Sequence, residues 1–216
     1  MNNILNPESK VLQFVTMIAN SALLNFLWFL CSIPIFTIGA STTALFSVTL
    51  KMVKNEEGSV ISQYFRAFKE NFKSATKVWL ILLAAGLFLA ADGYVLFHIW
   101  NSSPAWTLLT AAYFIVLAGY AITLMYVFPL MARFSNTTPA TIRNAFMIGM
   151  RALLCTALMA GIYFLMALVA VRFFTPILFF GFGLCALICS KLLDGILNIL
   201  AERAGIPGGN TDGNAS

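Results

Sequence analysis

Asp92 is the only acidic residue inside a predicted membrane span of this sequence. A charged carboxylate near the centre of a bilayer costs about 2.5 to 3.5 kcal/mol on insertion scales, so such a residue indicates an ion or proton site by default. The alternative is a structural hydrogen bond to a neighbouring helix, which the adjacent Gly93 favours because it leaves room for close approach. We expect the structural role, and Asp92 is the one candidate for an intramembrane polar site.

The other residues that could carry catalysis or bind a metal do not form a recognisable site. His98 is the only histidine, and its six-residue separation from Asp92 keeps the two side chains off a common helix face. Four cysteines, which we interpret as packing residues, lie in apolar stretches: Cys31, Cys155, Cys185 and Cys189. Common catalytic and nucleotide-binding motifs are missing. The sequence therefore predicts a protein that is not an enzyme and that has no cofactor or metal site.

The composition indicates a protein that uses lipid as its solvent. The 216 residues are 60% hydrophobic and only 10% charged, with a mean hydropathy of +0.88. A soluble domain carries roughly a quarter charged residues, so this chain cannot cover itself with polar surface. Its net charge is +5. Because the basic residues gather between apolar blocks, they suit an anionic membrane surface and not nucleic acid.

Apolar stretches of about 20 residues, the length that one helix needs to cross a bilayer, define the predicted fold. The five predicted spans lie near residues 11–33, 78–100, 105–132, 152–171 and 173–190. The predicted fold class is all-α, a polytopic transmembrane helix bundle that forms one domain over residues 1–206. The segment 207–216 is rich in Gly, Asn and Asp and is predicted to be a disordered tail.

A further apolar segment, residues 35–50, is rather short for a full crossing. Pro34 ends the preceding span, because proline lacks an amide hydrogen and clashes with the preceding helical turn. Thr37 and Gly39 follow in a predicted structural turn. We expect this turn to lead into a short helix that packs against the bundle, or that is re-entrant or interfacial. Whether the segment crosses the membrane is left open.

Basic residues mark the cytoplasmic side of a membrane protein. Eleven of the 13 Lys and Arg residues lie in the loops 51–77 and 133–151 or beyond the last span. We therefore expect both loops and the C-terminus to be cytoplasmic. Five crossings place the N-terminus outside, whereas a sixth crossing at residues 35–50 would place it inside. Asp194 and Asn198 follow the last span, and we interpret them as part of a solvated helix exit.

Both long loops contain a predicted amphipathic helix. In the second loop, Thr138 is predicted to be the N-cap and Pro139 the first helical residue. Both loops offer two alternatives: a helix that floats on the bilayer surface, or a platform that docks a partner. The candidate docking residues are Phe65, Phe68, Phe72 and Lys73.

Three segments of the first 80 residues resemble the YesL family of bacterial membrane proteins, whose members are grouped as a domain of unknown function. They are Leu24-Asn25-Phe26-Leu27-Trp28, the run from Ser32 to Leu45 with its Pro34-x-x-Thr37-x-Gly39 element, and the run from Phe65 to Lys73. The resemblance extends to nearly the whole chain in length and in the layout of the spans.

The resemblance implies a role in the bacterial cell membrane without a known enzymatic activity. Family members are often encoded beside carbohydrate ABC importers, which implies ABC permease and ATPase subunits as partners in addition to the lipid bilayer. We expect a non-enzymatic accessory subunit of a carbohydrate ABC import system. The alternative is a stand-alone small transporter or channel that uses Asp92 as its ion or proton site. A homo-oligomer stays possible in either case.

Overall fold

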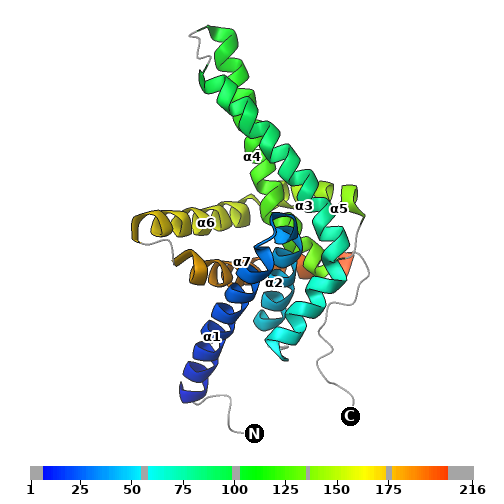
Figure 1. The fold of residues 1–216 in the computed structure, drawn as a ribbon, viewed down its shortest axis with the longest axis vertical. Helices are drawn as coiled ribbons and strands as arrows, with labels where there is room; N and C mark the ends of the chain where they lie inside the picture. The colour runs from blue at the N-terminus through cyan, green and yellow to red at the C-terminus, as the bar shows by residue number, and fades with distance from the viewer. Residues whose placement is uncertain (1–6, 55–57, 99–102, 135–136, 174–176, 204–216) are drawn as a thin grey trace.

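The computed structural model describes residues 7–54, 58–98, 103–134, 137–173 and 177–203. Within these ranges every regular element is a helix, so the predicted all-α class is confirmed (Figure 1). The elements are α1 (Pro7–Ser32), the 3-10 helix η1 (Ile35–Thr37), α2 (Ile38–Val53), α3 (Val60–His98), α4 (Pro104–Arg133), α5 (Thr138–Arg151), α6 (Leu153–Phe173) and α7 (Ile177–Arg203). The predicted disordered tail, 207–216, lies outside the described residues.

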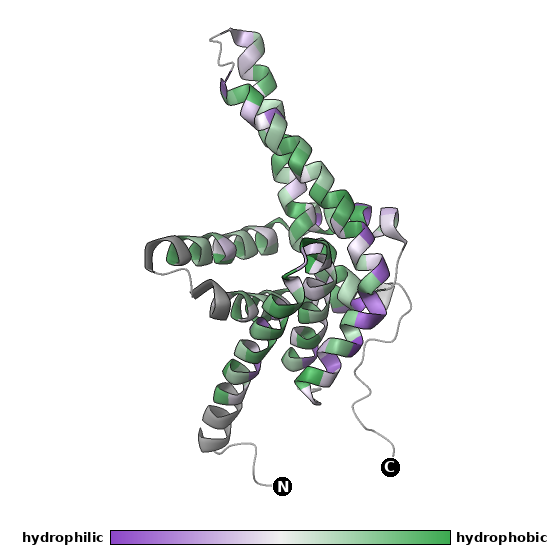
Figure 2. Cartoon of the chain, in the orientation of Figure 1, coloured by the Kyte–Doolittle hydropathy of each residue, from purple (hydrophilic) through white to green (hydrophobic). Residues whose placement is uncertain are grey.

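The chain is a multi-pass membrane protein. Five helical segments among the described residues are long and apolar enough to cross a membrane: α1, η1 with α2, α3, α4 and α7. The pair α5 and α6 adds a sixth if it forms one broken span, bent by 99°. Apolar residues run along almost the whole length of these helices, whereas polar residues gather at one side of the molecule (Figure 2). The first predicted amphipathic helix and the second predicted span form one continuous helix, the 39-residue α3.

Helix α2 occupies the centre of the molecule, where it packs against α1, α3, α4 and α7 (Figure 1). In the most apolar stretch within Ile35–Val53, 72% of the residues are buried inside the chain. In the most apolar stretch of α3, only 17% are buried. None of the residues of α2 itself, Ile38–Val53, is exposed. Helix α2 therefore packs against the bundle as expected, and a helix without an exposed face does not lie on a surface as an interfacial helix does.

Hydroxyl side chains fix α2 within this centre. Ser41 Oγ lies 2.7 Å from the hydroxyl of Tyr64 on α3, and Thr49 Oγ1 lies 2.8 Å from Ser190 Oγ on α7. All four side chains are buried. A buried hydroxyl needs a hydrogen-bond partner, so these pairs determine the register of α2 against both neighbours.

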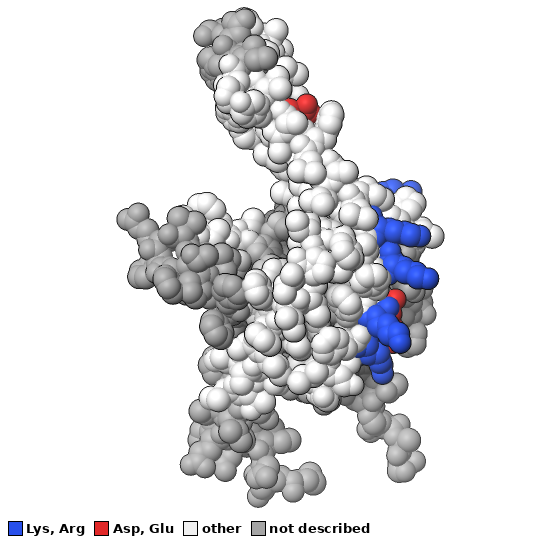
Figure 3. Space-filling model, in the orientation of Figure 1, with Lys and Arg blue, Asp and Glu red and all other residues white. Residues whose placement is uncertain are grey.

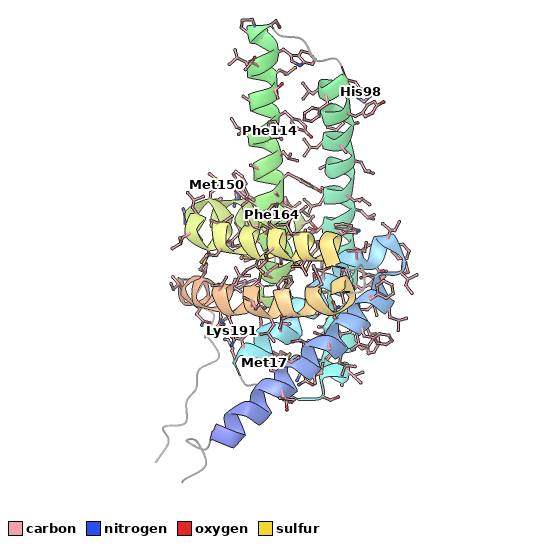
Figure 4. All side chains as sticks on the ribbon, turned by 90° about the vertical axis from the view of Figure 1, so that its left-hand side faces the viewer. Met17, His98, Phe114, Met150, Phe164 and Lys191 are labelled. Carbon is pink, nitrogen blue, oxygen red and sulfur yellow. The ribbon has the colours of Figure 1, made fainter. Side chains whose placement is uncertain are left out.

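Apolar arms diverge from this centre (Figures 1 and 4). The second half of α3 pairs with α4, where the hydroxyls of Tyr113 and Tyr120 donate to the carbonyls of Leu89 at 3.2 Å and Leu82 at 2.9 Å. Helices α6 and α7 form another arm, and α1 projects beyond its contacts with α2 and α7. The arms expose large apolar side chains, such as Phe164 on α6, which suits contact with lipid tails.

The start of α5 differs by one residue from the sequence-based expectation. The N-cap is Thr137 and not Thr138, so Pro139 is the second helical residue and not the first. The reason is that the carbonyl of Thr137 already accepts a backbone hydrogen bond from Thr141, at 2.9 Å. Proline is tolerated at either position, because the first amide groups of a helix have no partner within the helix.

We predict that Gly39→Ala destabilises the protein, because a Cβ at Gly39 would meet the side chain of Trp79 and the carbonyl of Ala75. Overpacking of this kind costs about 1 to 3 kcal/mol. The matched control is Gly161→Ala, where no other atom lies within 4 Å of the added Cβ. Thermal unfolding in detergent should show a lower midpoint for Gly39→Ala alone. Equal midpoints for the two variants would contradict the close contact of α2 with α3.

Candidate functional site

The turn that the sequence predicts at Pro34, Thr37 and Gly39 reverses the chain between α1 and α2. Thr37 is buried, and its hydroxyl lies 2.6 Å from the carbonyl oxygens of both Cys31 and Pro34. The indole of Trp79 donates a hydrogen bond of 2.7 Å to the carbonyl of Ile35. The turn is therefore attached to α3, and the absence of a side chain at Gly39 allows α2 to approach α3 closely.

The four candidate docking residues, all on the first half of α3, form two pairs that differ in burial. Phe68 and Phe72 are half-buried and pack against the core, with their ring centroids 5.5 Å apart. Phe65 and Lys73 are exposed. Phe68 also stacks on Tyr64, at 6.4 Å. Two of the candidates thus hold the helix on the core, while Phe65 and Lys73 are accessible to a partner. Docking itself stays a prediction.

Exposed basic side chains gather on one side of the molecule (Figure 3). Those on α3 and α5 are Arg66, Lys69, Lys73, Lys77, Arg143 and Arg151. Glu70 is an acidic neighbour, 3.4 Å from Arg66, and both side chains of this pair are largely exposed. One carboxylate offsets only one of these six cations, so the surface keeps a strong positive charge.

Asp92 belongs to the second half of α3, in the arm that extends away from this basic surface (Figure 3). The neighbouring Gly93 is buried against the hydroxyl of Tyr113, so the expected close approach of another helix at this point is present. Asp92 itself is exposed. Within the described residues its carboxylate has no ion pair and no side-chain hydrogen bond. The structural hydrogen bond expected for Asp92 is therefore not present among the described residues, and an ion-binding role stays a prediction.

Four polar side chains join the ends of α2 and α4 to α7. We call them the charged cluster: Lys54, Arg133, Asp194 and Asn198. One Arg133 nitrogen lies 3.2 Å from an oxygen of Asp194, and another donates to Asn198 at 2.6 Å. Asn198 donates to Asp194 at 3.1 Å. Lys54 Nζ lies 3.8 Å from Asp194 and 3.4 Å from the amide oxygen of Asn198.

The charged cluster is not the solvated helix exit that the sequence suggested for Asp194 and Asn198. The side chains of Arg133, Lys54 and Asp194 are only 15%, 19% and 22% exposed. Partial burial strengthens the attraction between opposite charges and raises the cost of leaving one of them unpaired. Lys54 and Arg133 each end a helix, where the dipole favours a cation. One carboxylate on α7 therefore binds the ends of two other helices.

Comparison with known proteins adds the family. Residues 21–93 match a family model described as "Protein of unknown function, DUF624". The chain is also 30% identical over 185 residues to the "Uncharacterized protein YesL" of Bacillus subtilis (strain 168), an alignment that covers 83% of this chain and 86% of that protein. The chain belongs to the YesL family. No solved structure matches it significantly.

For this YesL-family chain, the segment matched by the family model contains the Pro34 turn, α2, and α3 as far as Gly93. The charged cluster has only Lys54 inside that segment. Its other members come from α4 and α7, and 144 positions separate Lys54 from Asn198. The available sequence signal was the spacing of Asp194 and Asn198, four residues apart on one helix face. The sequence does not reveal the cations that meet this face.

We predict that Asp194→Asn destabilises the YesL-family protein, because it leaves Lys54 and Arg133 half-buried without a counter-charge. Breaking a buried ion pair by removing one partner costs about 3 kcal/mol or more. The matched control, Asp92→Asn, makes the same chemical change at an exposed position and should not lower stability. Thermal midpoints in detergent give the comparison. An equal or larger loss with Asp92→Asn would contradict the assignment.

Proposed function

We propose that this YesL-family protein is a non-enzymatic accessory subunit of a carbohydrate ABC import system in the bacterial cell membrane. The observation that supports the proposal best is the divergence of the apolar arms from one packed centre (Figures 1 and 4). Permease and ATPase subunits are the proposed partners, as the genomic neighbourhood typical of the family implies.

The arms leave apolar helix faces uncovered where they extend from the packed centre (Figure 1). On the α3–α4 arm, Phe88 and Ile115 are largely exposed, and on α6 the same is true of Leu154 and Leu165. Lipid tails cover such faces in an isolated protein. A membrane partner can replace lipid there without burying polar groups, because association within a bilayer depends on close packing. The arms therefore suit lateral contact with a permease.

The alternative, a stand-alone transporter or channel, has less support. A transporter places its binding groups between its helices, near the bilayer midplane. Here the centre is filled by the side chains of α2 and its neighbours. Asp92, the proposed ion or proton site, is exposed on an outer arm. The accessory role requires no such path, and we therefore prefer it.

The basic surface defines the proposed orientation. The first half of α3 and helix α5 face the cytoplasm in this proposal, as does the C-terminus, because basic residues gather on that side. With the five spans expected from the sequence, the N-terminus lies outside, whereas a crossing by α2 would bring it inside. A C-terminal tag should be accessible to protease in inside-out vesicles and protected in right-side-out vesicles. The opposite pattern would overturn the orientation.

We predict that the tagged protein, extracted from its native membrane in mild detergent, recovers ABC permease and ATPase subunits in stoichiometric amounts. Mass spectrometry of the captured material provides the measurement. Phe65→Ala and Lys73→Glu change exposed side chains on the first half of α3 and should reduce the recovery of the partners without loss of the protein itself. The matched control is Lys191→Glu, which reverses an exposed charge on α7.

Recovery of the protein alone, or as a homo-oligomer, would contradict the accessory role. Ion-flux assays in liposomes with wild type and Asp92→Asn would then test the transporter alternative. Normal partner recovery with all three substitutions would leave the accessory role in place, and it would show that contact is made through the apolar arms instead of the first half of α3.

A further inference from the structure

Helix α5 has one face on the core and the opposite face uncovered. Its buried residues, Thr141, Ala145 and Gly149, recur every four positions and therefore lie on one side of the helix. A Cβ at Gly149 would meet Ile122 and Tyr126 of α4, so this side of α5 lies in close contact with α4. The contact fixes which side chains of α5 point away from the protein.

The uncovered face of α5 is apolar in the middle and basic at both ends. Phe146, Met147 and Met150 are 41%, 42% and 47% exposed. Arg143 and Arg151 flank them and are exposed as well. Helix α5 contains no Asp or Glu, and within the described residues neither arginine has an ion pair. We call these five residues the α5 outer face.

A buried hydroxyl holds α5 across the direction of α6. The Thr156 hydroxyl on α6 lies 2.9 Å from the carbonyl oxygen of Gly149 and 3.0 Å from that of Ala152, where the two helices meet. It also lies 2.9 Å from the hydroxyl of Tyr126 on α4. The 99° bend between α5 and α6 is therefore a corner that three contacts fix. A helix that turns so sharply away from an apolar helix suits a position along the bilayer surface.

The contacts of α5 place it near the edge of the apolar region. Phe146 lies beside Gly119 of α4, and the next residue, Tyr120, donates a hydrogen bond of 2.9 Å to the carbonyl of Leu82 on α3. Leu82 comes five positions after Lys77, the last Lys or Arg of α3. Five helical residues rise about 7.5 Å. Helix α5 thus crosses α4 close to the level at which the basic part of α3 gives way to its apolar part.

We propose that the α5 outer face binds anionic phospholipid, with its apolar middle among the acyl chains and its two arginines on the headgroup phosphates. Arginine binds phosphate through charge-assisted, bidentate hydrogen bonds. Helices that combine basic and apolar side chains associate with anionic bilayers through both kinds of contact. The exposed cations of α3 lie on the same side of the molecule (Figure 3) and add to the attraction.

Lipid fits the α5 outer face better than a second protein does. A stable protein interface uses about 20 to 30 residues on each side, whereas this face has five. An acidic protein would neutralise the arginines but would also have to cover the apolar middle. Phospholipid supplies a phosphate and an acyl chain in one molecule. The flexible side chains of the two methionines adapt readily to acyl chains.

The experiment measures which lipid lies beside α5. Met147→Cys, in a full-length variant without other cysteines, carries a bimane fluorophore in liposomes of equal phosphatidylglycerol and phosphatidylcholine. A nitroxide quencher is placed on the acyl chain of one lipid or of the other. Phosphatidylglycerol should quench the fluorophore more strongly than phosphatidylcholine. The matched control is Ile115→Cys, which is 74% exposed in an uncharged stretch of α4 and should show equal quenching by both lipids.

Substitutions then test the arginines. Arg143→Gln and Arg151→Gln should each lower the preference for phosphatidylglycerol by about fivefold. Replacement of both arginines by lysine keeps the two charges and should retain most of the preference. The matched control is Lys191→Gln, which removes an exposed cation on α7 and should leave the preference unchanged.

Three results would overturn the proposal. Weak quenching by both lipids would show that α5 does not face the bilayer. Equal quenching by both would show contact with acyl chains without binding of the headgroup. A preference that survives the loss of both arginines would show that other cations attract the lipid. Thermal midpoints identify any variant that fails to fold, and the single substitutions decide the question if the double variant does not fold. These results do not depend on whether ABC subunits co-purify, because the purified protein is tested alone.

Discussion

The hydroxyl groups of α2 impose the constraint on which the rest of the structure depends. A helix that carries serine and threonine into an apolar environment must find a hydrogen-bond partner for each buried hydroxyl. Ser41 finds Tyr64, and Thr49 finds Ser190. These partners belong to α3 and α7. Ser41 also donates to the carbonyl of Trp28, and Thr49 to that of Phe46 within α2, so the two hydroxyl pairs favour one register of α3 and α7 against α2 without being the only partners of these hydroxyls. The centre is therefore fixed, and the apolar arms extend from it.

The charged cluster completes the centre at one end of α2. Two cations from the ends of α2 and α4 share one carboxylate on α7. The hydrophobic effect does not drive membrane helices together, because lipid tails are as apolar as the helix faces. Specific polar contacts consequently carry much of the information on which helix lies beside which. This division suits an accessory role, in which a rigid centre presents apolar arms to a partner.

Local features of the sequence predicted much of this fold. Hydropathy gave the apolar helices, the apolar periodicity gave the amphipathic first half of α3, and Pro34 marked the end of α1. The Thr37 and Gly39 turn was likewise evident from residue type alone. These signals were sufficient because each acts within a few residues of its own position.

Contacts between distant parts of the chain could not be predicted in the same way. The central burial of α2 depends on four other helices, and its hydropathy resembles that of a short membrane segment. The ion pair of Arg133 with Asp194 joins residues 61 positions apart. For Phe68 and Phe72 the sequence indicated an apolar face but not what covers it, and the structure places the core of the same chain there.

A designed disulfide tests most directly whether α2 packs against α7 in one register. Thr49→Cys and Ser190→Cys, introduced together into a variant without other cysteines, replace two hydroxyls that lie 2.8 Å apart. Mild oxidation should link them efficiently, as seen by mass spectrometry of the cross-linked peptides. Thr49→Cys with Ile188→Cys, an exposed position on α7, should not cross-link. Absence of the first cross-link, or equal yields for both pairs, would contradict this register of α2 against α7.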